Sequence, residues 1–190
     1  MDGARRLSQA IAEGDGISVL VEVSNIEGAR AATEQGAEGL VVRHHAGVIR
    51  EISSLPLLGF GSADDLGAID AVVVDVLKVR DSLREVVAAA HDRGLECVLR
   101  VSEADDLEAV LELVDPEIIL LSAEEADDGQ SALDRLLELL PDIPAGKLAI
   151  AELFGASRAA VIELERAGVD AVIVSGSDTG SLVGDTLPDL

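Results

Sequence analysis

The sequence repeats one unit, in which a helical stretch ends at a glycine and a short run of apolar, often β-branched residues follows. The clearest copies are residues 36–42, 67–74 and 168–174, and residues 94–99 form a weaker copy. A glycine just after a helix, followed by a continuous apolar run, is typical of the junction between a helix and a buried parallel strand. The repetition therefore predicts a parallel sheet built from successive strand–helix units.

Eight segments of the chain have the pattern of a buried strand. They cover residues 17–23, 39–43, 56–60, 71–75, 96–101, 117–121, 148–152 and 171–175. Amphipathic stretches with apolar residues at i, i+3 and i+4 lie between them, at residues 26–35, 79–93, 103–113, 130–140 and 156–167. A further helix over residues 2–13 precedes the first strand. The helices after strands two, three and eight are expected to be reduced to a turn or two, and Asp64 and Asp65 suit the start of the one after strand three.

Eight strand–helix units favour closure of the sheet into a ring. The predicted fold is therefore a compact α/β protein, a (β/α)8 TIM barrel that occupies residues 1–190 as a single domain. The alternative is an open, doubly wound sheet of the flavodoxin or Rossmann type. Residues 24–28, which follow the first strand, read Ser-Asn-Ile-Glu-Gly and not G-x-G-x-x-G, which argues against a dinucleotide site.

The chain is strongly acidic, with a formal net charge of −23. Such a charge repels nucleic-acid phosphates and anionic lipids, so neither nucleic acid nor a membrane is expected as a partner. The single cysteine, Cys97, cannot form an intramolecular disulfide and is expected in the core. Residues 1–16 lack a signal-peptide pattern and no apolar run approaches the roughly 20 residues of a membrane span, so a cytoplasmic location is expected. The oligomeric state is left open.

Charged residues interrupt three of the apolar strands. Glu22 lies in the first strand, Arg100 in the fifth, and Glu152 at the end of the seventh. A charge inside such a run is costly unless it is paired or faces a wet cavity. Because ligand sites in this fold lie at the carboxyl ends of the strands, these three residues are the candidate catalytic group. The alternative is a Glu22–Arg100–Glu152 ion network that only closes the top of the barrel.

Other polar residues also fall at the predicted strand ends, among them Arg43, Asp75, Lys78 and Ser122. Turns rich in glycine and serine follow the last two strands. Backbone N–H groups in such turns, together with a helix N-terminus, form the usual phosphate site of these barrels. The candidate phosphate-binding residues are Gly155, Ser157, Gly176, Ser177 and Arg43. The alternative is that these turns bind nothing.

The two aromatic residues, Phe60 and Phe154, fall at strand ends on the mouth side of the barrel. They could sandwich a planar ligand or cover the apolar core, and both are retained as candidate ligand-binding residues. The neighbouring His44 and His45 are expected to point in different directions, so no metal site is predicted, although one of them could serve as a general acid or base. No cofactor is predicted.

With these residues in place, the chain resembles the indole-3-glycerol phosphate synthase family of tryptophan biosynthesis. The resemblance extends over nearly the whole chain and is closest in residues 132–174, where the segments 147–152 and 167–174 follow the family's order. Val21-Glu22-Val23 is similar to the family's first-strand glutamate segment. The resemblance implies a lyase barrel that binds a small phosphorylated molecule, with Glu22 and Glu152 as two of its glutamates and with Gly176 and Ser177 in its phosphate loop.

The chain departs from that family at the positions of its other catalytic residues. Ser24 stands in place of a lysine, Gly59-Phe60-Gly61 in place of Lys-Asp-Phe, Arg100 in place of a glutamate, and Ser122-Ala123-Glu124 in place of Asn-Asn-Arg. The family's reaction uses a lysine ammonium as general acid for ring closure and loss of water. Normal synthase activity is therefore not expected.

The sequence leaves three functions open. The first is a diverged enzyme or sugar-phosphate binder of the synthase type. The second is a barrel without catalysis, acting as a binding or scaffold protein. The third is another phosphate-handling barrel, such as an isomerase or an epimerase.

Overall fold

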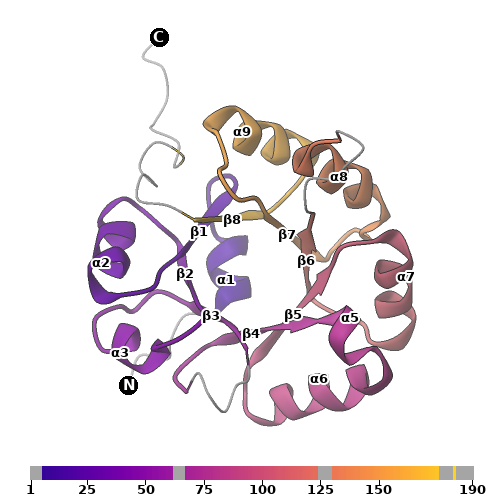
Figure 1. The fold of residues 1–190 in the computed structure, drawn as a ribbon, viewed down its shortest axis with the longest axis horizontal. Coiled ribbons are helices and arrows are strands. Elements are labelled where there is room, and N and C mark those ends of the chain that lie inside the picture. The colour runs from indigo at the N-terminus through magenta and orange to yellow at the C-terminus, as the bar shows by residue number, and fades with distance from the viewer. Residues whose placement is uncertain (1–5, 62–66, 124–129, 176–181, 183–190) are drawn as a thin grey trace.

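The computed structural model describes residues 6–61, 67–123, 130–175 and 182. Eight parallel strands form a closed barrel, in which each strand pairs with the next along the chain and the last pairs with the first (Figure 1). The strands are β1 (Ser18–Glu22), β2 (Gly39–Val42), β3 (Leu57–Phe60), β4 (Ala71–Asp75), β5 (Glu96–Val101), β6 (Ile118–Ser122), β7 (Leu148–Glu152) and β8 (Ala171–Ser175). The predicted (β/α)8 barrel is confirmed, and the open-sheet alternative is wrong.

Helices surround the barrel as Figure 1 shows, except for the first, which is seen within the ring in this view. They are α1 (Leu7–Ala12), α2 (Ile26–Glu34), α3 (Ala46–Arg50), α5 (Val76–Val79), α6 (Leu83–Asp92), α7 (Ala104–Leu113), α8 (Ala132–Leu139) and α9 (Arg158–Ala167), with 3-10 turns η1 (Arg80–Ser82) and η2 (Leu140–Asp142). α3 has five residues, as expected of a reduced helix after strand two. The turns expected after strands three and eight, Asp64 and Asp65 included, lie outside the described residues. Where the chain is described, no helix has the length and apolar character needed to cross a membrane.

The amphipathic stretch predicted near residues 79–93 contains α6, but the structure divides its beginning. α5 ends at Val79, η1 follows, and α6 begins at Leu83. The Ser82 hydroxyl donates a hydrogen bond to the Val79 carbonyl at 3.4 Å, and such local serine bonds compete with the helical backbone pattern. α6 still packs its predicted apolar face on the barrel, where Leu83 and Ala90 are buried.

Side chains on the strands alternate between the barrel interior and the surrounding helices. The middle of the interior is filled by apolar residues, Leu20, Val41, Leu58, Val73, Val98, Leu120, Ile150 and Ile173. By the same alternation, the next inward-facing position lies two residues further along the chain from each of these. These eight positions are occupied by Glu22, Arg43, Phe60, Asp75, Arg100, Ser122, Glu152 and Ser175. We call these eight positions the mouth layer. An apolar core thus supports a mostly polar layer at the carboxyl end of the barrel.

The opposite end of the barrel is closed by α1. Leu7 and Ile11 are buried in the same cluster as the interior strand residues. Ser8 anchors the helix, because its backbone N–H (3.3 Å) and its hydroxyl both donate to the carboxylate of the buried Glu96. α1 therefore covers the end of the barrel interior opposite the mouth.

Cys97 is buried, as predicted, and its burial raises the pKa of the thiol from 9.0 to about 11. A thiol whose pKa is higher in the folded than in the unfolded state favours folding below about pH 9 and loses that contribution as the pH rises to about 11. Between these two pH values, we expect the wild-type protein to lose about 2 kcal/mol more unfolding free energy than Cys97→Ala, at 1.36 kcal/mol per pKa unit. Urea denaturation at each pH measures the difference. An identical pH dependence in both proteins would show that the thiol titrates normally.

Candidate functional site

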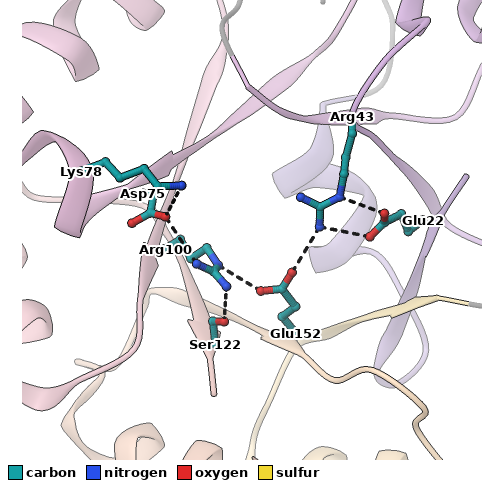
Figure 2. A network of polar contacts seen from close by, with 7 residues as sticks. All are labelled: Glu22, Arg43, Asp75, Lys78, Arg100, Ser122 and Glu152. Atoms are coloured by element: carbon teal, nitrogen blue, oxygen red, sulfur yellow. Dashed lines mark hydrogen bonds and ion pairs between the residues drawn. The ribbon is translucent and has the colours of Figure 1, made fainter. Parts of the chain in front are cut away.

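Seven polar side chains at the carboxyl end of the barrel form one continuous network (Figure 2). We call it the mouth network, and its members are Glu22, Arg43, Asp75, Lys78, Arg100, Ser122 and Glu152. Six of them come from the strand ends and belong to the mouth layer, and Lys78 comes from α5. Three carboxylates face three cations, so the network is formally neutral on a protein of net charge −23.

Glu152 lies at the centre of the network, with its side chain only 2% exposed. Arg100 Nε donates to Glu152 Oε2 at 3.0 Å, and Arg43 Nη2 lies 3.8 Å from Oε1. A carboxylate this deeply buried is costly unless cations and hydrogen-bond donors compensate it. The two guanidinium groups supply that compensation, one for each oxygen.

Arg43 joins Glu152 to Glu22. Its Nε and Nη2 donate to the two carboxylate oxygens of Glu22, at 2.9 and 3.3 Å. This side-chain hydrogen bond raises the pKa of Arg43, so the group remains a cation. The guanidinium carbon also lies 4.4 Å from the centre of the Phe60 ring, a cation–π contact that places the charge above the apolar interior.

Arg100 extends the network to the other side of the mouth. Its Nη2 donates to Ser122 Oγ at 2.6 Å, and its Nη1 lies 3.4 Å from Asp75 Oδ2. Lys78 Nζ approaches the same Asp75 oxygen at 3.1 Å. The strand register explains the contact with Asp75, which is the direct β4 partner of Arg100. The direct β6 partner of Arg100 is Leu120, and Ser122 is the next inward residue along β6.

The structure brings the three predicted catalytic residues into one network but corrects the links between them. Arg100 contacts Glu152, as the predicted ion network requires. Glu22 is bonded to Arg43 in place of Arg100. The reason is the strand order, since β2 is the neighbour of β1 and β5 lies across the barrel from it. Arg43, predicted only as a phosphate ligand, is the bridging residue.

Two strand-end residues that the prediction did not select, Asp75 and Ser122, also belong to the network, as does Lys78. Asp75 and Ser122 were visible in the sequence as polar residues at strand ends, and Lys78 as a polar residue that follows a strand. Period-2 alternation counted from the apolar interior places Asp75 and Ser122 in the same layer as Glu152. Lys78 has no such signal, because it reaches the mouth from a helix and not from a strand.

The predicted phosphate-binding turn is partly described. Gly155 has a φ of 68°, in the left-handed region where a side chain would be strained. Ser157 is the N-cap of α9, and its side chain accepts a hydrogen bond from the Ala160 N–H at 3.2 Å. Gly176 and Ser177 lie outside the described residues. The turn after β7 therefore ends in a regular, capped helix N-terminus close in sequence to Glu152.

A cavity of about 690 Å³ opens beside the mouth network, within the size range of ligand sites. Its charged lining residues are Arg43, Asp75, Lys78, Arg93, Arg100 and Glu152. Phe60 and Phe154 line the same cavity, so the two aromatic rings share one space. Phe60 is in contact with Arg43, whereas Phe154 is 56% exposed.

The two neighbouring histidines lie outside the mouth network. His44 is exposed, and His45 adopts a φ of 60° immediately before α3. Their ring centres are 6.3 Å apart with the planes inclined at 63°. Over the described residues, no group of three or more His, Cys, Asp and Glu side chains is arranged to hold a metal ion.

No family model matches the chain. Among curated proteins, it is 23% identical over 163 residues to the indole-3-glycerol phosphate synthase of Geobacillus sp. (strain WCH70). The match covers 86% of this chain and 62% of that protein, so the chain spans less than two thirds of the relative's length. The sequence is thus similar to that synthase, at an identity too low to establish membership of its family.

Three solved structures illustrate the fold similarity. The N-acetylmannosamine-6-phosphate 2-epimerase of Clostridium perfringens gives a TM-score of 0.69 at 14% identity, covering 84% of this chain and 86% of that one. 3-Hexulose-6-phosphate synthase gives 0.68 at 14% identity over 84% and 90%. Thiamine phosphate pyrophosphorylase of Pyrococcus furiosus gives 0.65 at 16% identity over 93% and 92%. At these identities the comparisons establish the barrel fold alone.

Proposed function

We propose that the mouth of this barrel binds a small phosphorylated molecule. The observation that carries the proposal is that Arg43, Lys78 and Arg100, from three separate segments, line one cavity at the carboxyl ends of the strands. Charge-assisted hydrogen bonds from arginine and lysine are the usual means of holding a phosphate. On a chain of net charge −23, an anion needs such a local gathering of cations.

The exposure of the three cations indicates how a phosphate is received. The Lys78 side chain is 79% exposed and that of Arg43 is 42% exposed, whereas that of Arg100 is only 26% exposed. Lys78 can therefore turn toward a ligand by giving up its ion pair with Asp75. Arg43 keeps its two hydrogen bonds to Glu22 and would meet a ligand from its present position. Arg100 remains on Glu152 and keeps that buried carboxylate compensated. Gly155 and the N-terminus of α9 do not line the cavity themselves, although Phe154, the residue before Gly155, does.

The relatives support this class of ligand. The names of the synthase, the epimerase, the hexulose phosphate synthase and the pyrophosphorylase all contain a phosphorylated compound. By resemblance, Glu22 and Glu152 correspond to two of the glutamates of the synthase family. The lysines of that family are absent here, since Ser24 and Gly59-Phe60-Gly61 stand at their positions. We therefore infer a diverged, synthase-like barrel that binds a phosphorylated ligand without the normal synthase reaction.

The absence of synthase activity can be measured directly. Without a lysine ammonium at those positions, the ring closure lacks its general acid. We expect no turnover of the synthase substrate when the reaction is followed by the fluorescence of the indole product. Turnover that depends on Glu152 would contradict this part of the proposal.

A second candidate function follows from the charge balance of the mouth network. Its three carboxylates and three cations satisfy one another without any ligand. This balance favours a scaffold barrel in which the network only seals the mouth. The two functions differ in one measurable property, which is binding of a phosphorylated compound at the mouth.

Lysine substitution separates these functions. We expect glycerol 3-phosphate to shift the backbone amide resonances of the mouth strands and of Gly155, at constant ionic strength. Lys78→Gln should weaken this binding by about tenfold, as loss of one charge-assisted hydrogen bond of about 1.5 kcal/mol requires. The matched control is Lys147→Gln, which removes the same charge. Lys147 lies just before β7 and pairs with Asp115. Absence of shifts, or equal weakening in both variants, would favour the scaffold.

A further inference from the structure

The cavity at the mouth continues beyond the polar network. Beside Asp75, the lining continues along the outer side of β4, the end of α5 and one side of α6. The residues that line this part are Val72, Val74, Val79, Val86, Ala89 and Ala90. Among the residues that the structure describes, Arg93 is the one charged residue lining this part. We call this part the apolar arm of the cavity. The cavity therefore has one charged end and one hydrocarbon-lined end.

The strand lengths explain why the barrel mouth opens into this arm. β3 ends at Phe60, which pairs with Val73, so the last residues of β4 extend past the end of β3. Gly59 is the register partner of Val72 and contributes no side chain beside it. The same cavity is consequently lined by side chains from both faces of β4. Val73 and Asp75 face inward, and Val72 and Val74 face outward. Around the end of β4, the polar mouth and the outer surface of the sheet are one continuous space.

We propose that the ligand is an amphiphilic phosphate, with its phosphate on the cations of the mouth and a hydrocarbon chain in the apolar arm. This inference rests on the proposed function and specifies its ligand class. Val72, Val74 and Ala90 are already buried in the core, so the accessible part of the arm is formed by the other three side chains. A small polar sugar phosphate would leave Val79, Val86 and Ala89 in contact with water. A hydrocarbon chain covers them, and each methylene transferred from water contributes favourably to binding. The mostly uncharged lining of the arm, as far as the chain is described, lies next to three cations and matches that division of the ligand.

Binding of two alkyl phosphates tests the proposal. By calorimetry, hexyl phosphate should bind at least about tenfold more tightly than methyl phosphate, since a tenfold change needs fewer than two buried methylenes. Ala89→Phe fills the arm from an exposed position of α6 and should remove this advantage, with methyl phosphate binding unchanged. The matched control is Ala88→Phe, at the adjacent exposed position that does not line the cavity, which should keep the full advantage. Ala89→Leu, a smaller and helix-compatible change, should reduce the advantage in part, and thermal unfolding checks that each variant folds.

The outcomes separate this inference from the proposed function. If methyl phosphate binds and hexyl phosphate binds no better, the apolar arm is not part of the site, while the phosphate site stands. If hexyl phosphate keeps its advantage in Ala89→Phe, the hydrocarbon chain lies elsewhere and the inference is wrong. If neither compound binds, the proposed function itself fails.

Discussion

Arg100→Ala is expected to lower the free energy of unfolding by about 3 kcal/mol, the range for removing one partner of a buried ion pair. The reason is Glu152, which is 2% exposed and loses its 3.0 Å partner in this variant. Arg43 alone, at 3.8 Å, compensates it less well. Urea denaturation at neutral pH measures the loss.

Two further variants distinguish this cause from a general loss of packing. Arg166→Ala removes an arginine from an exposed position of α9 and should change stability by less than about 0.5 kcal/mol. Adding Glu152→Gln to Arg100→Ala removes the uncompensated charge and should restore a large part of the loss. If the double variant is no more stable than Arg100→Ala, the buried carboxylate is not the cause. The stability result also bears on function, because a large loss without any ligand binding would favour the scaffold.

Leu7→Ala is expected to destabilise the protein by a similar amount, about 3 kcal/mol. Leu7 is fully buried in the cluster of the barrel interior, at the end opposite the mouth. Gly39 lies beside it, and the missing side chain of this glycine leaves room for Leu20. An added Cβ at Gly39 would lie 2.8 Å from Leu20 Cδ2 and 3.6 Å from Leu7 Cδ1. Truncating Leu7 therefore leaves a cavity that the rigid strands cannot close.

The matched control for Leu7→Ala is Leu77→Ala, which removes the same atoms from a side chain that is 59% exposed on α5. We expect the control to cost less than about 1 kcal/mol. Chemical denaturation of both variants gives the comparison. Equal losses would mean that α1 does not close the barrel, and that the interior is accessible from both ends.

The sequence predicted the strands of this barrel closely, and the reason is local. Each strand is a short apolar run, and several are preceded by a glycine that ends a helix, so pattern and turn chemistry agree on where the strand begins. β4, β5, β7 and β8 have the predicted limits, and the other four strands differ by one residue at one or both ends. The 3-10 turn at Arg80–Ser82, just before α6, was not predicted. The Ser82–Val79 hydrogen bond there is a local polar contact that hydrophobic periodicity does not detect.

The mouth network could be predicted in its position but not in its connections. A charge in an apolar strand must be paired or face a cavity, which identified Glu22, Arg100 and Glu152. Assigning the partner of each charge requires the position of each strand around the barrel. Because β1 and β2 are neighbours, the partner of Glu22 is Arg43. Lys78 could not be assigned, because the direction of α5 follows from how the chain turns after β4. The apolar arm was not predicted, because it depends on the early end of β3 relative to β4.

The most direct test of the phosphate site is a crystal structure of the protein soaked in phosphate. We expect an ordered anion in the cavity of the mouth, within hydrogen-bond distance of Lys78 or Arg43, with the Arg100–Glu152 pair intact. A mouth without an anion, at a phosphate concentration that fills another site on the same molecule, would contradict the account.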